Sequence, residues 1–382
     1  MIASKLPDVG TTIFTVMSRL AEEHRAVNLG QGFPDFEPPE ALKAALARHV
    51  AAGKNQYAPM AGVPALRAGI AAELARFYGR SVDPERELTI TSGATEAIFD
   101  VIAAVVRPGD EVVVLDPAYD SYEPSVLLQG GRCVHVPLLP PRFAVDWQRV
   151  ADAVGPRTRL VIVNFPHNPS GAVLEPHDLD ALAALLRGTD ALLLSDEVYE
   201  HIVFDGRAHQ SVLRHDELYA RSFVVSSFGK CYHATGWKIG WITAPPALTA
   251  EVRKVHQFVT FATSTAAQHA LADVLHELPA HLAELGPFYQ QKRDRFRELV
   301  AGVPFELLPV SGAYFQLADY SALSDEDDVS FARRLTTEVG VAAIPLSPFY
   351  AEPPAQRLVR FCFCKKPETL ELAAERLRRL TR

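Results

Sequence analysis

Residues 191–200 read ALLLSDEVYE, four apolar or small residues followed by Ser195 and Asp196. An apolar run without polar alternation is typical of a strand that is covered on both faces in a parallel sheet. Ligands of open parallel sheets bind beyond the carboxyl ends of the strands. We therefore expect the Asp196 carboxylate at the floor of a ligand-binding crevice, with a cationic or hydrogen-bonding partner. A helix N-cap is an equally favoured local alternative.

Further runs of this kind lie between about residues 85 and 245, and helical segments such as ATEAIFDVIAAVV (94–106) separate them. Strand–helix alternation predicts an α/β fold with a large domain, in which helices flank a mostly parallel, seven-stranded sheet. The other runs are ELTITS (87–92), EVVVLD (111–116), RCVHVPL (132–138), RLVIVNF (159–165), SFVVSSF (222–228) and IGWITA (239–244).

The pattern changes after Pro287. A charged helical segment, FYQQKRDRFRELV, leads into shorter strand-like runs that include RLVRFCF (357–363). This change predicts a second, smaller α/β domain. We place the large, ligand-binding domain at residues 36–285. Residues 1–35, as an N-terminal arm, and residues 286–382 form the small domain in this prediction.

Composition argues against several classes of function. The 382 residues carry a net charge of −8 without a basic block, which disfavours nucleic-acid binding. No run approaches the roughly 18 apolar residues of a membrane span, and MIASKLPDVGTTIF has no apolar signal core. The four cysteines show no zinc-binding or disulfide spacing, so we expect no metal and a reducing compartment. We expect a cytoplasmic protein.

Two motifs after predicted strands offer contacts to a ligand. In TSGATEAI (91–98) a helix begins at Gly93–Thr95, where small residues and free N–H groups favour phosphate. Ordinary helix capping is the alternative, and it is favoured if the motif stands alone. In NFPHNPSG (164–171), Asn168 either forms a tight turn or donates from its amide to a ligand oxygen.

The stretch SSFGKCYHATGWKIGW (226–241) holds two lysines among small and aromatic residues. Lys230 follows a predicted strand, so it should point into the crevice. A desolvated amine has a lowered pKa, and its neutral form attacks an aldehyde to give a Schiff base. Ser227 and Lys238 can then supply a hydroxyl and a positive charge to a phosphate. Two surface lysines beside a turn are the alternative, which the scarcity of other charges disfavours.

Arg360 interrupts the apolar run RLVRFCF. It either reaches the surface, the commoner fate, or presents its planar fork to a carboxylate. Together the candidates describe a phosphate site, an aldehyde-reactive lysine, an acid for a ring nitrogen and a fork for an amino-acid carboxylate. These requirements point to one ligand, pyridoxal 5′-phosphate.

The order and spacing of the motifs resemble the class I (fold type I) pyridoxal-phosphate-dependent aminotransferases. Within that family, the chain is similar to the branch of methionine aminotransferases and kynurenine–glutamine transaminases. The resemblance covers nearly the whole chain. The motifs that carry it are VNLGQGFPDF (27–36), NQYAPMAG (55–62), TSGATEAI, DPAYDSYEP (116–124), NFPHNPSG, SDEVYEH (195–201), SSFGKCYHATGWKIGW and VRFCF (359–363).

The resemblance implies a role for each matching residue. Lys230 forms the Schiff base with the cofactor and later carries protons between the substrate Cα and the cofactor C4′. Asp196 pairs with the pyridine nitrogen and keeps it protonated. Tyr199 and Asn168 hydrogen-bond the cofactor O3′. Arg360 anchors the substrate α-carboxylate.

The same resemblance places further residues around the cofactor and the substrate. Tyr119 stacks on the cofactor ring, while Gly32 lines the substrate pocket. Tyr57 reaches the phosphate from the neighbouring subunit, which implies a homodimer. Many members carry arginine where Lys238 stands. A lysine here keeps the positive charge but cannot form the two parallel hydrogen bonds of a guanidinium. The residues implied at the phosphate end are Gly93, Ala94, Thr95, Ser227 and Lys238.

The substrate preference is predicted from the pocket for the side chain. QFVTFATSTAAQ (257–268) has no arginine for a distal carboxylate, while Phe14 and Phe261 offer an apolar site or, alternatively, pack in the core. We expect ping-pong transfer from methionine, an aromatic amino acid, glutamine or kynurenine to a 2-oxo acid. A pyridoxal-phosphate-dependent cysteine-conjugate or cystathionine β-lyase, which uses the same lysine, is the alternative. A DNA-binding regulator is disfavoured by the short, weakly basic segment before the first motif.

Overall fold

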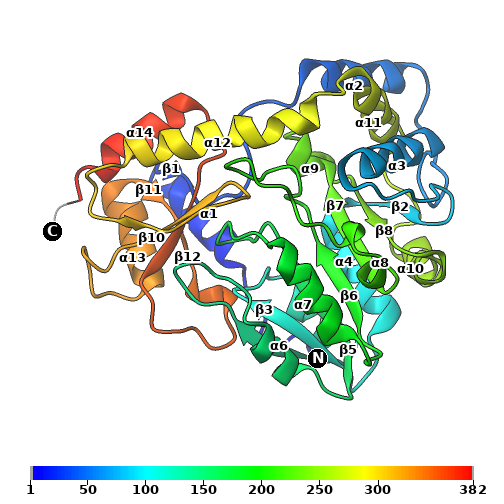
Figure 1. Ribbon diagram of the computed structural model, residues 1–382. Helices are drawn as coiled ribbons and strands as arrows, with labels where there is room; N and C mark the ends of the chain where they lie inside the picture. The colour runs from blue at the N-terminus through cyan, green and yellow to red at the C-terminus, as the bar shows by residue number, and fades with distance from the viewer. Residues whose placement is uncertain (1–2, 381–382) are drawn as a thin grey trace.

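A computed structural model describes residues 3–380, and a seven-stranded sheet forms its centre (Figure 1). β8 runs antiparallel to both of its neighbours, and the other adjacent strands are parallel. Each predicted run forms one strand, so the mostly parallel, seven-stranded sheet is confirmed. In spatial order the strands are β2 (Leu88–Thr91), β8 (Gly240–Thr243), β7 (Ser222–Ser227), β6 (Leu192–Asp196), β5 (Thr158–Asn164), β3 (Glu111–Asp116) and β4 (Arg132–Pro137).

The central strands β3 and β5 are almost wholly apolar because both of their faces are buried. In β3, Val112 packs into one apolar core and Val113 into the other. β5 divides in the same way between Ile162 and Val161. Neither face of such a strand is open to solvent, so neither favours polar residues. This explains why apolar and polar residues do not alternate along these strands in the sequence.

Helices supply the cover on both faces (Figure 1). α4 (Gly93–Val105) packs against β6, β7 and β8, and α10 (Pro246–Val259) packs against α4. Because α4 begins directly after β2, its first turn lies at the carboxyl edge of the sheet. The other helices around this sheet are α2 (Glu40–Ala51), α3 (Pro64–Tyr78), α5 (Tyr122–Leu128), α6 (Trp147–Ala153), α7 (Pro176–Leu186), α8 (Asp216–Tyr219), α9 (Phe228–Cys231) and α11 (Thr265–Glu277).

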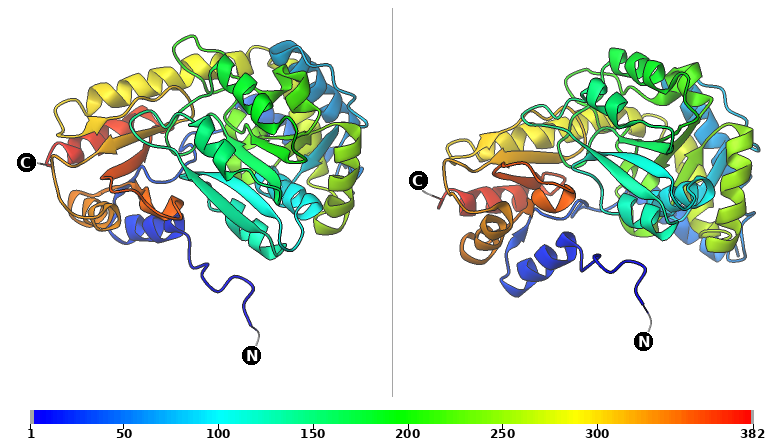
Figure 2. Two further views of the ribbon diagram at one scale, coloured as in Figure 1. Left: turned by 60° about the horizontal axis from the view of Figure 1, so that its bottom comes forward. Right: turned by 90° about the horizontal axis from the view of Figure 1, so that it is seen from below.

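A second sheet, four-stranded and antiparallel, lies beside the first. Its order is β12 (Ile344–Pro345), β13 (Leu358–Cys362), β10 (Phe315–Asp319) and β9 (Glu306–Leu307). β1 (Val27–Asn28) pairs in parallel with β11 (Val341–Ala342), so the N-terminal part of the chain joins the C-terminal part. The segment before α1 extends away from both sheets (Figure 2). The helices here are α1 (Ile13–Glu23), α13 (Asp328–Arg334) and α14 (Pro367–Leu377).

The long helix α12 (His281–Leu299) runs along both parts of the molecule and contacts α14 (Figure 1). It begins before Pro287, where the sequence pattern placed the change, because buried Leu282 and Leu285 extend the packed helix face. The predicted boundary between residues 285 and 286 falls inside this helix. The division into residues 36–285 and residues 1–35 with 286–382 stays a prediction, and its ends at 1–2 and 381–382 lie outside the described residues.

The helices do not resemble membrane spans. α12 has 19 residues and includes the charged run QQKRDRFRE. Within residues 3–380, no helix has both the length and the apolar character needed to cross a membrane.

Candidate active site

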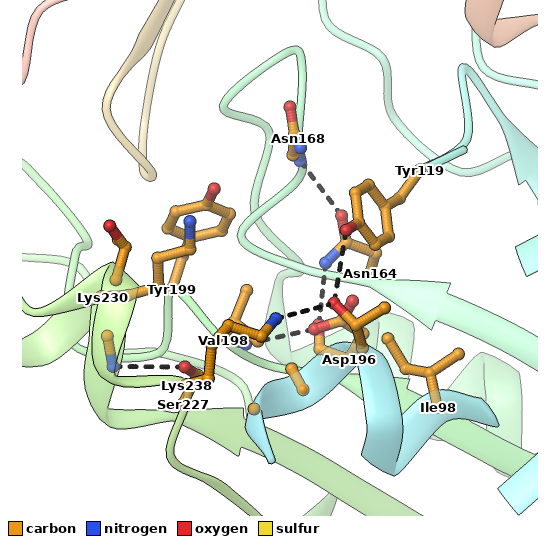
Figure 3. Close-up of a pocket in the computed structure, with 15 residues that line it drawn as sticks. Ile98, Tyr119, Asn164, Asn168, Asp196, Val198, Tyr199, Ser227, Lys230 and Lys238 are labelled. Atoms are coloured by element: carbon orange, nitrogen blue, oxygen red, sulfur yellow. Dashed lines mark hydrogen bonds between the residues drawn. The ribbon is translucent and has the colours of Figure 1, made fainter. Parts of the chain in front are cut away.

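A cavity of about 190 Å³ opens at the carboxyl ends of β5, β6 and β7, beside the first turn of α4 (Figure 3). The sheet brings the predicted cofactor-binding residues together here, because they lie at the strand ends, or in the loops and helix starts, along this edge. Their individual roles stay predictions. The predicted residues that line the cavity are Gly93, Ala94, Thr95, Tyr119, Asn168, Asp196, Tyr199, Ser227, Lys230 and Lys238.

Asp196 ends β6 and is only 3% exposed. The Tyr122 hydroxyl donates to Asp196 Oδ2 (2.7 Å), and the Val198 N–H makes a longer bond to Oδ1 (3.4 Å). Burial raises the pKa of Asp196 to about 6, although both hydrogen bonds and the charge of Lys230 lower it. A buried carboxylate with one weakly bonded oxygen can bind a cationic N–H of a ligand strongly.

Lys230 lies in α9, directly after β7. Its Nζ donates to the Gly32 carbonyl (3.4 Å) and lies 5.5 Å from the ring centre of Tyr199. Desolvation lowers the pKa of Lys230, against the opposing effect of nearby Cys364 and other groups. The neutral, nucleophilic amine is therefore more populated than it would be in water.

Tyr199 and Asn168 approach the cavity from two different segments (Figure 3). The Tyr199 ring packs edge-on against Tyr314, with ring centres 5.1 Å apart. Burial raises the pKa of the Tyr199 hydroxyl, so this group stays a hydrogen-bond donor near neutral pH. The Asn168 backbone N–H donates to Asn164 Oδ1 (3.2 Å), and Asn168 Oδ1 accepts from Arg360 (2.7 Å).

The end of the cavity beside α4 is formed largely by backbone. Gly93 has a φ of +75°, and a Cβ there would lie 3.1 Å from Lys238 Cε and Nζ, so glycine makes room for that side chain. Lys238 Nζ donates to Thr95 Oγ1 (3.4 Å), which lies 3.5 Å from the Tyr119 hydroxyl. Ser227 Oγ accepts from the Gly229 N–H (3.2 Å). Free N–H groups at the start of α4 and the lysine together favour an anion.

Arg360 lies within β13 and is 1% exposed, which rules out the surface alternative. Its Nη2 donates to the Gly30 carbonyl (2.7 Å) and its Nη1 to Asn168. Its Nε has no hydrogen-bond partner among the described residues. The guanidinium lies 4.0 Å from the Phe315 ring centre and 5.1 Å from that of Phe14. A buried cation with a donor to spare can bind a carboxylate.

Gly32 and Phe14, predicted for the substrate pocket, lie next to these groups. The Gly32 carbonyl accepts from the Tyr314 hydroxyl (2.7 Å) and from Lys230. Phe14 packs against Phe349, with ring centres 5.3 Å apart. The surroundings of the arginine are therefore aromatic and apolar.

Tyr57 and Phe261 do not line this cavity. Tyr57 is 84% exposed and its ring packs edge-on against Phe261, with centres 5.5 Å apart. Exposed aromatic residues are enriched at protein interfaces. The predicted reach of Tyr57 into a neighbouring subunit stays a prediction, and so does the predicted contact of Phe261 with substrate.

The sequence interpretation missed Asn164 and Tyr122. Asn164 Nδ2 donates to the Asp196 carbonyl (3.0 Å), and Asn164 Oδ1 holds the backbone of Asn168. Asn164 is the last residue of β5, so the rule that singled out Asp196 could have found it. Tyr122 begins α5, and nothing in the sequence shows that its hydroxyl points to Asp196.

Residues 24–377 match the family model for class I and II aminotransferases, and the chain belongs to this family. The chain is 54% identical to the methionine aminotransferase of Escherichia coli K12, over 99% of this chain and 98% of the relative. It is 33% identical to mouse kynurenine–oxoglutarate transaminase 1, over 98% and 96% of the two chains. The crystal structure of Escherichia coli YbdL, described as having a methionine aminotransferase function, superposes with a TM-score of 0.98 at 53% identity over both whole chains.

These similarities confirm the fold type I architecture, and they confirm a pyridoxal-phosphate-dependent aminotransferase acting on an amino acid and a 2-oxo acid. Nothing in the comparisons points to the β-lyase alternative.

The residues of the cavity fit this cofactor. Asp196, buried and ready to accept, suits the pyridine nitrogen, and the amine of Lys230 suits the aldehyde carbon. The turn at Gly93 with Lys238 suits the phosphate. Glycine is also required at Gly240, where a Cβ would lie 2.8 Å from the Ala94 nitrogen and crowd this turn.

Proposed function

We propose that the amino donor is methionine or another large neutral amino acid, such as an aromatic amino acid, glutamine or kynurenine. The observation that carries this preference is the aromatic setting of Arg360, between Phe14 and Phe315. Among the described residues, the cations that line the cavity are Lys230 and Lys238, both used by the cofactor in this proposal. No cation is left there for a distal carboxylate. The similarity to methionine and kynurenine aminotransferases supports the same preference.

Lys230, Asp196 and Tyr199 are the catalytic residues in this proposal. Pyridoxal phosphate, when bound, supplies a sink for the electrons of the substrate Cα–H bond. Lys230 would move the proton between the substrate Cα and the cofactor C4′, and desolvation lowers its pKa, which favours the neutral amine that acts as a base. Asp196 holds the proton on the pyridine nitrogen. Tyr199, with its raised pKa, donates its hydroxyl hydrogen to the cofactor O3′.

Arg360 orients the substrate through its α-carboxylate. The unpartnered Nε shares one side of the guanidinium plane with Nη2, and this pair can face the two carboxylate oxygens. The rings of Phe14 and Phe315 exclude water from this cation and strengthen its attraction for the carboxylate. Asn168 accepts from Arg360 Nη1 through its Oδ1, and its Nδ2 is the group that donates to the cofactor O3′ in this proposal.

Assembly and location belong to the same proposal. The exposed ring of Tyr57 supports a homodimer in which it reaches the phosphate of the neighbouring subunit. The cysteines at 133, 231, 362 and 364 are free thiols, which suits the reducing environment of the cytoplasm. Analytical ultracentrifugation tests the first statement, and fractionation of cells tests the second.

A donor–acceptor matrix, followed through the absorbance of the cofactor, tests the substrate preference. We expect methionine and aromatic donors to give kcat/KM values at least about a hundredfold above that of aspartate, since an unpaired distal carboxylate is costly to bury. A preference for aspartate would contradict the proposal. Release of pyruvate and ammonia from cysteine conjugates without a 2-oxo acid would instead indicate lyase chemistry.

A further inference from the structure

A buried cluster of Glu96, Asp100 and His256 lies behind the first turn of α4, outside the cavity. Glu96 and Asp100 lie on α4, and His256 lies on α10, which packs against it. His256 and Asp100 are fully buried. His256 Nδ1 lies 2.8 Å from Glu96 Oε1 and 3.5 Å from Asp100 Oδ2. None of these residues has a role in the proposed chemistry.

Both ring nitrogens of His256 act as hydrogen-bond donors. Nε2 lies 3.1 Å from the Met60 carbonyl oxygen, which can only accept. Nδ1 faces two carboxylates. Burial alone would lower the pKa of His256, but the carboxylates of Asp100 and Glu96 raise it to about 9. Since both ring nitrogens face oxygen acceptors, the three residues form a hydrogen-bonded bridge.

One end of the bridge holds the turn that faces the phosphate end of the cavity. The second carboxylate oxygen of Glu96 accepts a hydrogen bond from the Ser92 N–H. Ser92 directly precedes Gly93, and the Thr91 hydroxyl donates to the Gly93 carbonyl (3.1 Å). The position of this turn is therefore tied through Glu96 to His256.

The other end of the bridge holds the loop that presents Tyr57. Met60, whose carbonyl accepts from His256, lies three residues after Tyr57. The His256 carbonyl also accepts from the Phe261 N–H (2.9 Å), and the Phe261 ring packs against Tyr57. His256 is thus linked to Tyr57 by its side chain through Met60 and by its backbone carbonyl through Phe261.

We propose that His256 is a positioning residue that aligns both halves of the phosphate site. It joins the turn at Ser92–Thr95, which serves the cofactor of its own subunit, to the loop at Gln56–Met60, which serves the neighbouring one. The inference deepens the proposed function and rests on the homodimer described there. As a consequence, the buried side chain of each His256 sets the affinity for cofactor at the site of its own subunit and at the site of the neighbouring subunit.

Two substitutions separate the two ends of the bridge. An asparagine amide lies near the place of Nδ1, so His256→Asn keeps a donor for Glu96 and loses the bond to Met60. A glutamine amide reaches the place of Nε2, so His256→Gln keeps a donor for Met60 and loses the bond to Glu96. His276→Gln is the matched control, because His276 is exposed on α11 and takes no part in the bridge.

The dissociation constant of pyridoxal phosphate is measured on the apoenzyme of each variant, together with the ³¹P shift of the bound phosphate. Each His256 variant is expected to bind the cofactor about tenfold more weakly, because one hydrogen bond to a charged or buried partner is lost. The ³¹P shift is expected to move in both, whereas a purely structural loss would change only the melting temperature. His276→Gln should match the wild type.

The Tyr57→Phe background then tests the path of each effect. His256→Asn acts through Tyr57, so it should add nothing in that background, whereas His256→Gln should still weaken binding about tenfold. Wild-type affinity and ³¹P shift in both His256 variants would overturn the inference, and so would a His256→Asn effect that persists beside Tyr57→Phe. A wild-type protein that takes up no pyridoxal phosphate would instead refute the proposed function itself.

Discussion

The two ends of the cavity are built in different ways. At the ring end, Asp196 and Tyr199 are each 3% exposed, and Asp196 has a close partner in Tyr122 at 2.7 Å. At the phosphate end, Lys238 is exposed and its contact to Thr95 is 3.4 Å long. The groups of the first end are held by close contacts, whereas the second end offers backbone N–H groups and the exposed charge of Lys238 to an anion.

This difference assigns different tasks to the two ends. In the proposed function, the groups whose pKa values burial has shifted, such as Asp196 and Lys230, act on the chemical step. Groups near water contribute less per contact, because solvent screens their charge. Changes at the ring end should therefore lower kcat, and changes at the phosphate end should mainly weaken cofactor binding.

The largest effect is expected for Lys230→Ala, which removes both the amine that attacks the aldehyde and the proton carrier. Transamination should fall by at least about 10⁴-fold, the upper range for loss of a general acid–base group. Steady-state rates with methionine and a 2-oxo acid measure this. Lys254→Ala, an exposed lysine paired with Glu251 on α10, is the control and should keep full activity.

Asp196→Asn should lower kcat by about 10²- to 10³-fold, the range seen when one preorganised electrostatic contact is removed. The buried amide cannot hold a proton on the pyridine nitrogen. Single-turnover kinetics at saturating cofactor separate this loss from weaker binding. If kcat stayed normal and only cofactor affinity fell, the division between the two ends would be wrong.

Arg360→Lys should raise KM for the amino acid by about tenfold to a hundredfold, since the fork is lost while the charge is kept. Cofactor affinity should change much less than KM, because Arg360 reaches the cofactor only through Asn168 and has no contact at the phosphate end. KM and the dissociation constant of pyridoxal phosphate, measured on one preparation, test both statements. Unaltered KM would show that the α-carboxylate binds elsewhere.

Lys238→Ala should weaken cofactor binding by about tenfold, the value of roughly one charge-assisted contact. At saturating pyridoxal phosphate its kcat should stay close to that of the wild type. Equilibrium titration of the apoenzyme provides the constant. A fall in kcat as large as that of Asp196→Asn would remove the distinction between the ends.

The last effect concerns the pH dependence of stability. It involves the bridge of Glu96, Asp100 and His256 behind the phosphate end. The pKa of His256 is raised from 6.5 to about 9, so the stability it contributes is complete below pH 6.5 and is lost as pH rises through 9. Wild-type apoprotein should lose on the order of 3 kcal/mol of unfolding free energy over this interval. Denaturant unfolding at several pH values should show a smaller loss in His256→Asn.

The sequence predicted those parts of the molecule that depend on neighbouring residues in the chain. Uninterrupted apolar runs revealed the sheet, and the rule of carboxyl ends led to Asp196 and Lys230. Tyr122 and His256 could not be found in this way, because their partners come from distant segments that only folding brings together. The start of α12 before Pro287 was missed because tertiary packing outweighs the local preference of proline there.

The central claim is that one amine, that of Lys230, holds the cofactor. Borohydride reduction of the purified holoenzyme, followed by peptide mapping with mass spectrometry, identifies the labelled residue directly. A phosphopyridoxyl group is expected on the peptide containing Lys230 and on no other. A label on Lys238, or a protein that gains no such group after incubation with pyridoxal phosphate, would contradict it.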